Sequence, residues 1–132
     1  FNLGVNDMAN ASNYVSYMTN IAPTLKKKNC KLFYMSVNPI NSTMITKAGR
    51  GARTEAQVRE FNSKIHSGLS VYYKFIDTYS VLMKKGYGTN ASYVGVDRDS
   101  DDGLHYTTKT YKRIYYYCVT YLNTGSINAT YY

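Results

Sequence analysis

A short apolar segment, KLFYMSV, runs from Lys31 to Val37 and is followed directly by Asn38-Pro39. Aromatic and branched residues favour strands, and a short apolar run that ends at a proline is typical of a buried strand. The sequence therefore predicts a strand at 31–37 and a turn at Asn38-Pro39.

Helical and strand patterns alternate on both sides of this segment, which predicts an α/β domain with a parallel sheet. Before the segment we expect a strand end at 1–3 and a helix through Tyr14–Leu25 that closes at 26–29, which Pro23 bends or divides. After it we expect a loop at 40–53, a helix from Thr54 to Leu69 and a strand at 72–76. The remaining elements are a short helix from Asp77 or Thr78 to Lys85, a polar loop at 87–104, and a last helix from Thr107 or Thr108 to Leu122.

The spacing of apolar residues predicts which helix faces are buried, because positions three or four apart share one face. For the helix at 54–69 the predicted buried stripe is Val58, Phe61, Ile65 and Leu69. For the last helix it is Tyr111, Ile114 or Tyr115, Cys118 or Val119, and Leu122.

Length and composition favour one globular domain over residues 1–132, with a loose tail at 123–132. Hydrophobic residues make up 44% and charged residues 18% of the chain, which excludes collagen-like, disordered and coiled-coil classes. No apolar run is long enough for a transmembrane helix. Because the chain begins with Phe1 rather than Met and shows no signal-peptide pattern, we expect a processed product or a piece of a longer protein.

The chain is basic, with 16 Lys+Arg against 8 Asp+Glu and a formal net charge of +8. Such a surface attracts polyanions, whether nucleic acid, anionic lipid or an anionic cell wall. No recognised nucleic-acid motif is present, so we expect no specific nucleic-acid partner. The densest basic patches are Lys26–Lys28 with Lys31, then Arg50 with Arg53 and Arg59, then Lys109 with Lys112 and Arg113.

The two cysteines and the many tyrosines predict packing rather than metal binding. Cys30 and Cys118 lack metal-ligand spacing and occupy apolar positions, which favours buried free thiols over a disulfide. The chain has 16 Tyr and no Trp, and Tyr combines a large buried ring with a polar tip. We expect most of these rings in the core and its rim, with some available to stack on sugars.

Two histidines are candidates for chemistry. His66 lies one step off the apolar stripe of its predicted helix, which is typical of a solvated side chain. His105 follows Asp102 by three residues at the end of a polar loop, where a carboxylate can bond one ring nitrogen and leave the other as a base. By spacing alone, Asp102 is equally well explained as a structural cap.

The sequence predicts no metal and no cofactor. Asp97, Asp99, Asp101 and Asp102 form an acidic cluster, but a calcium loop that starts at Asp97 would need Gly and Glu where Asp102 and Thr108 stand. The glycine-rich motifs that cradle nucleotide phosphates are absent as well.

The turn Gly4-Val5-Asn6-Asp7 follows the first predicted strand end. Glycine permits a tight turn, and a fixed amide N–H of Asn6 could stabilise a developing oxyanion. Parallel sheets place their sites at the carboxyl ends of the strands. An Asn donor at the first such end and a His base in the last loop would be two parts of an acyl-transfer site.

These motifs together resemble the SGNH (GDSL-type) hydrolases. Gly4-x-Asn6-Asp7 resembles the third conserved block of that family, Asp102-x-x-His105 its fifth block, and the segments at 34–39, 61–65 and 75–79 are similar to secreted members from Gram-positive gut bacteria. The resemblance covers residues 1 to 122.

The resemblance implies a flavodoxin-like three-layer α/β/α sandwich that hydrolyses acyl or acetyl esters of carbohydrates or lipids, without metal or cofactor. His105 would be the general base, Asp102 would orient it, and Asn6 would donate to the oxyanion. Gly4 and Asn38 would line the ester-binding site. The resemblance also implies a secreted or cell-surface protein.

One departure from the family concerns the nucleophile. The family's catalytic serine lies in a Gly-Asp-Ser motif, which occurs nowhere in this sequence, and nothing around Ser36 or Ser42 marks a nucleophile. We therefore expect this chain to be the C-terminal part of the domain, without its N-terminal strands and inactive alone. Its open sheet edge should then pair with the N-terminal part or with a second copy.

Two other functions stay open. The first is a non-catalytic module on the same scaffold that binds glycan or cell wall through its tyrosines and basic patches. The second is a basic nucleic-acid binder, whose affinity would fall steeply with salt.

Overall fold

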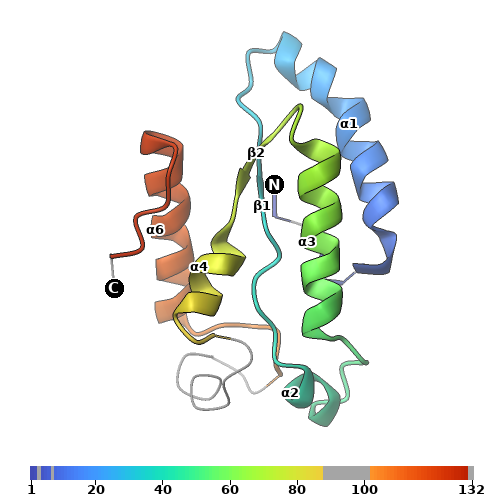
Figure 1. The fold of residues 1–132 in the computed structure, drawn as a ribbon, viewed down its shortest axis with the longest axis vertical. Helices are drawn as coiled ribbons and strands as arrows, with labels where there is room; N and C mark the ends of the chain where they lie inside the picture. The colour runs from blue at the N-terminus through green and yellow to red at the C-terminus, as the bar shows by residue number, and fades with distance from the viewer. Residues whose placement is uncertain (3, 7, 88–101, 131–132) are drawn as a thin grey trace. The chain divides into compact units, whose positions relative to one another are not determined.

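The computed structural model describes residues 1–2, 4–6, 8–87 and 102–130 (Figure 1). The chain divides into two compact units. The first unit comprises residues 1–37 and 56–77, and the second comprises 38–55 and 78–132. The prediction of an α/β chain is confirmed at this level, because helices accompany a parallel sheet.

The sheet of the first unit has β1 (Phe33–Met35) and β2 (Lys74–Ile76), paired in parallel with Tyr34 opposite Phe75. Both strands lie inside the ranges that the sequence predicts and are shorter than those ranges. On the other side of β1, the Phe1 ammonium donates to the Phe33 carbonyl at 2.9 Å, and the Met35 N–H donates to the Phe1 carbonyl at 2.7 Å. These two bonds bracket Tyr34, which is the spacing of a parallel ladder.

Two long helices accompany this sheet, α1 (Ala11–Lys27) and α3 (Glu55–Leu69), and a short 3-10 turn, η1 (Met8–Asn10), precedes α1. Of the two expectations for Pro23, a bend or a division of the helix, the division is wrong, because α1 continues through it. Proline removes only its own N–H from the helix ladder, and the bonds of the neighbouring turns keep the helix continuous.

The core of the first unit follows the predicted stripe of α3. All four of its members are buried, namely Val58, Phe61, Ile65 and Leu69. The helices α1 and α3 lie side by side (Figure 1), and a Cβ added at Gly68 would lie 2.6 Å from a methyl carbon of Val15. Glycine at position 68 therefore sets how closely the two helices approach.

A buried amide ties α3 to the end of β1. The side-chain oxygen of Asn62 accepts from the Val37 N–H at 2.8 Å, and its amide nitrogen donates to the Val37 carbonyl at 2.9 Å. Both backbone groups of Val37 are thereby satisfied beyond the last residue of the strand, where no ladder partner would otherwise meet them.

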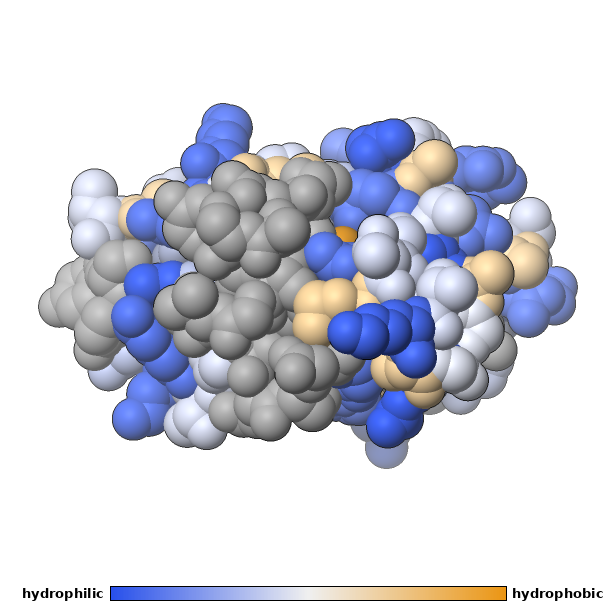
Figure 2. Space-filling view, turned by 90° about the horizontal axis from the view of Figure 1, so that it is seen from below, coloured by the Kyte–Doolittle hydropathy of each residue, from blue (hydrophilic) through white to orange (hydrophobic). Residues whose placement is uncertain are grey.

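The second unit is helical over its described residues, with α2 (Ser42–Lys47), α4 (Thr78–Lys84) and α6 (Thr108–Thr124). The prediction of a loop throughout 40–53 is wrong, because α2 lies within it. Asn41 explains this helix, since its side-chain oxygen caps the Met44 N–H at 2.9 Å. In Figure 2, hydrophilic side chains, drawn in blue, project from several places on the surface.

The last helix begins as predicted, with Thr107 as its cap, but Ile114 is the one buried residue of its predicted stripe. Its buried residues are Thr110, Ile114 and Tyr117, whereas Tyr111, Tyr115 and Leu122 are exposed. Large apolar or aromatic residues recur at helical spacing on two faces of α6, because tyrosine occurs on both. Apolar spacing alone therefore selects the wrong stripe.

Both cysteines are free thiols. The expectation of burial is wrong for Cys30, which is exposed just after the end of α1, where lysines leave its surroundings open to solvent. Cys118 on α6 is partly covered, and burial raises the pKa of its thiol.

Candidate functional site

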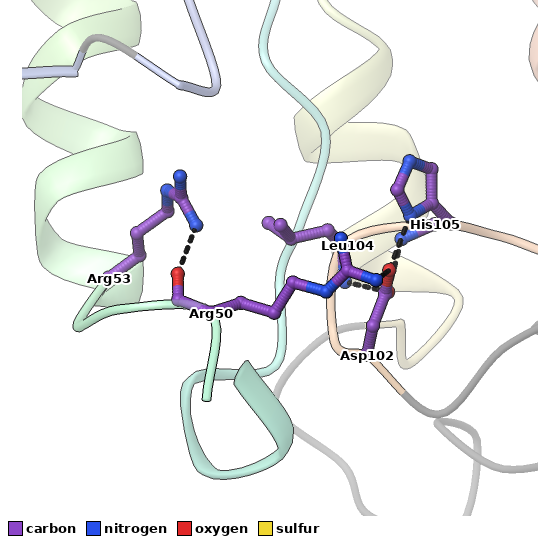
Figure 3. Close-up of polar contacts among 5 residues, drawn as sticks. All are labelled: Arg50, Arg53, Asp102, Leu104 and His105. Carbon is purple, nitrogen blue, oxygen red and sulfur yellow. Dashed lines mark hydrogen bonds and ion pairs between the residues drawn. The ribbon is translucent and has the colours of Figure 1, made fainter. Parts of the chain in front are cut away.

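The site is built on the pair that the sequence predicts, Asp102 and His105, which the structure brings together (Figure 3). Oδ2 of Asp102 lies 2.5 Å from Nδ1 of His105. Oδ1 accepts from the backbone N–H groups of Leu104, at 2.8 Å, and His105, at 2.9 Å. One oxygen caps the turn and the other holds the ring, so the structural and the orienting explanations of Asp102 are both satisfied by one side chain.

The two residues of the pair differ in exposure. The Asp102 side chain is 7% exposed, whereas that of His105 is 59% exposed. Within the part of the chain that the structure describes, Nε2 of His105 has no hydrogen-bond partner. A carboxylate on Nδ1 favours the tautomer in which Nε2 carries the lone pair. That nitrogen can therefore take a proton from a group that approaches from solvent.

Several effects act on the acid of the pair. Burial of Asp102 opposes its ionisation, but hydrogen bonds outweigh this cost. The His105 backbone N–H, the His105 imidazole and the Leu104 N–H together hold the pKa of the carboxyl far below its ordinary value. Asp102 is therefore an anion at neutral pH and can stabilise a positive imidazolium.

The turn that carries the pair is anchored to α2. Gly103 adopts φ +81°, and a Cβ at this position would lie 2.6 Å from the carbonyl oxygen of Asn41 and equally close to Ile45. The Asn41 N–H also donates to the Gly103 carbonyl at 2.9 Å. Only glycine fits this approach, so the position of the Asp102–His105 turn depends on the helix that the sequence did not predict.

The residues after Val37 belong to the same unit as this pair. The hydroxyl of Tyr106 donates to the Pro39 carbonyl, which fixes the residue next to His105. The side-chain oxygen of Asn38, a residue that the resemblance assigns to ester binding, accepts from the Thr78 hydroxyl at 2.6 Å. This bond ties the side chain of Asn38 to Thr78, the first residue of α4.

Gly4 and Asn6 belong to the first unit. Gly4 is buried with φ +117°, and a Cβ there would lie 2.2 Å from a ring carbon of Phe61. Packing under this ring accounts for a glycine at position 4. Asn6 is exposed in the turn that follows Gly4.

The other predicted candidates take no part in the pair. His66 is exposed on α3 and stacks on Phe75 with ring centroids 4.7 Å apart. Ser36 is fully buried, and Ser42 begins α2. Over the described residues no serine hydroxyl bonds to His105.

The acidic cluster that the sequence pointed to lies outside the described residues, except for Asp102. Over the residues that the structure describes, no three His, Cys, Asp or Glu side chains gather as metal ligands would.

One residue of the site was missed. Arg50 places Nη2 3.9 Å from Oδ2 of Asp102, the oxygen that also holds His105 (Figure 3). The sequence marks Arg50 only as part of a basic patch, because fifty-two positions separate it from Asp102 along the chain. The glycines on either side of Arg50 are the one local sign in the sequence that this residue lies in a tight loop with a defined backbone conformation.

Comparisons with known proteins give no match: no family model, no curated protein and no solved structure matches this chain significantly. Within its described part, no helix combines the length and the apolar character that crossing a bilayer demands.

Proposed function

We propose that this chain carries the base and its orienting acid for a serine ester hydrolase of the SGNH type, acting on acyl or acetyl esters of carbohydrate or lipid. The observation that supports the proposal is the Asp102–His105 pair, with its short Oδ2–Nδ1 contact, a His105 side chain that is 59% exposed, and an Nε2 with no hydrogen-bond partner among the described residues. In this proposal the domain is a flavodoxin-like sandwich and the protein is secreted or displayed at the cell surface.

The proposed reaction moves one proton through His105. Nε2 accepts the proton of a serine hydroxyl while the serine oxygen attacks the ester carbonyl carbon. The resulting imidazolium is stabilised by the Asp102 carboxylate and returns the proton to the departing alcohol. Water then repeats the sequence on the acyl-serine and releases the acid.

Asn6 is proposed as a donor to the oxyanion of the tetrahedral intermediate. Asn6 lies in an exposed turn after Gly4, and a side-chain amide can supply an N–H donor to a developing oxyanion. The nucleophilic serine is proposed to lie outside these 132 residues, because the chain contains no Gly-Asp-Ser and Ser36 is fully buried.

The test uses the product of the complete gene. It is incubated with a fluorophosphonate, which labels activated serines, and its hydrolysis of p-nitrophenyl acetate is measured. We expect turnover and an adduct on a serine outside Phe1–Tyr132. An adduct on Ser36 or Ser42 would refute the assignment of the nucleophile, and absence of both turnover and adduct would refute the hydrolase.

A second candidate function is glycan binding without turnover. It is favoured by Tyr111 and Tyr115, which lie one turn apart on α6 and are 45% and 65% exposed. Aromatic rings at this spacing can stack on successive sugars. Binding of oligosaccharides by the complete gene product that is lost in Tyr115→Ser, without ester hydrolysis, would favour this function over the hydrolase.

A further inference from the structure

Arg50 lies beside the pair but is only weakly engaged by it. Its Nη2 is 3.9 Å from Oδ2 of Asp102, beyond hydrogen-bond distance, and its side chain is 55% exposed. Within the described ranges the Arg50 side chain makes no hydrogen bond. A guanidinium carries five N–H donors, so most of its binding capacity is unused here.

The carboxylate of Asp102 is already committed to other partners. Oδ1 accepts two backbone N–H groups, and Oδ2 accepts from the His105 ring. The groups that lower the pKa of Asp102 are likewise those of His105 and Leu104. Stabilising Asp102 therefore does not account for Arg50.

The backbone of Arg50 is nevertheless held firmly. Its N–H donates to the Ile45 carbonyl at 3.1 Å, and its carbonyl accepts from Nη1 of Arg53 at 2.8 Å (Figure 3). Gly49 and Gly51 on either side adopt φ +67° and +78°. This loop fixes the main chain of Arg50 and brings the Arg53 guanidinium close to it. The Arg50 guanidinium itself is left in solvent.

We propose that Arg50 forms an anion subsite next to His105, so that the ester substrate carries a carboxylate or a phosphate group close to its scissile bond. The proposal rests on the proposed hydrolase function, of which it names the substrate class. Arginine binds carboxylates and phosphates through two parallel N–H donors, and Arg53 adds positive charge to the same loop. Since Arg50 and His105 reach the same oxygen of Asp102, an anion on Arg50 would place its ester near Nε2.

Turnover is measured with the complete gene product on three acetate esters of similar size: para-acetoxybenzoate, para-acetoxyphenyl phosphate and the neutral para-acetoxybenzamide. The Arg50→Gln variant is compared with Arg59→Gln, which removes a charge from an exposed position on α3. We expect Arg50→Gln to lower kcat/KM for at least one anionic ester about ten- to a hundredfold. The value for the neutral ester, para-acetoxybenzamide, should change little. Arg59→Gln should leave all three unchanged.

The anionic ester whose kcat/KM falls more in Arg50→Gln identifies carboxylate or phosphate as the ligand. An equal loss on all three esters would overturn the subsite, because Arg50 would then act through Asp102 as a positioning residue. If Arg50→Gln leaves kcat/KM unchanged for all three esters, the subsite is overturned as well. Absence of turnover on all three esters in the unmodified protein would refute the hydrolase itself, and is a distinct result.

Binding tests the subsite without turnover. Benzoate and phenyl phosphate are titrated into the ¹⁵N-labelled gene product while the Nε–Hε signal of Arg50 is followed, this signal being assigned by its absence in Arg50→Gln. A saturable shift that Arg59→Gln retains is expected for one of the two anions. Absence of a saturable shift with either anion would overturn the subsite, whatever the esters show.

Discussion

The two histidines of this chain lie in different units, and both face solvent, yet their surroundings differ in one respect. His66 of the first unit stacks on an aromatic ring, whereas His105 of the second unit has a buried carboxylate on one nitrogen. Exposure therefore does not distinguish a candidate base from a surface histidine. What distinguishes it is a partner that fixes the ring, together with a turn that fixes the partner.

The largest expected effect separates these two histidines. His105→Ala in the complete gene product should lower ester turnover on the order of 10⁴-fold or more, because the proton acceptor is lost. His66→Ala should change it by less than about twofold. Initial rates with p-nitrophenyl acetate measure both, and similar rates for the two variants would remove the distinction.

A smaller effect is expected from the partner alone. Asp102→Asn can keep its one oxygen for the two backbone N–H groups, which places its N–H₂ group against Nδ1 of His105. We expect a loss of about 10²- to 10⁴-fold in turnover with the fold intact, since the tautomer preference changes while the turn survives. Circular dichroism checks the fold, and a rate equal to that of the unmodified protein would show that Asp102 is only a cap.

In the first unit, the free energy of unfolding should depend on packing around Gly4 rather than on polar contacts. Gly4→Ala inserts a Cβ into the ring of Phe61 at positive φ and should lower the free energy of unfolding by about 2–4 kcal/mol. Gly125→Ala is the control, because φ is +78° there and nothing lies within 4 Å of its Cβ. Urea unfolding measures both. A Gly4→Ala loss no larger than the control would show that Phe61 moves away freely.

The smallest expected effect is on stability against pH. The pKa of Asp102 is lower in the folded chain than its ordinary value of 3.8, so the folded state gains stability from its ionisation above that value. This gain should disappear as pH falls below 3.8 towards the folded pKa. Unfolding of the unmodified protein and of Asp102→Asn should therefore differ at neutral pH and converge in acid. A difference that stays constant with pH would contradict the sign of this shift.

The features that sequence predicts well here are local. The stripe of α3 follows from spacing within fifteen residues, and the Asp102–His105 pair follows from a turn of three, so nearest neighbours determine both. The helix α2 is six residues long and depends on its cap and on a distant glycine, which periodicity does not record. The buried face of α6 was misassigned because tyrosine suits core and surface equally well.

Long-range contacts account for the rest of the candidate site. Arg50 meets Asp102 only after the chain has folded, and its place in a basic patch gives no sign of this. The role of Asn6 remains a prediction from the resemblance, as does the nucleophile.

The close approach of α1 and α3 at Gly68 has a consequence for related sequences. A side chain at position 68 would occupy the volume that Val15 fills, so the two positions should vary together in size. Relatives with alanine or serine at position 68 should carry a smaller residue at position 15, such as alanine or glycine. Positions 15 and 68 thus form a pair whose substitutions, collected across species, would record the spacing of these two helices.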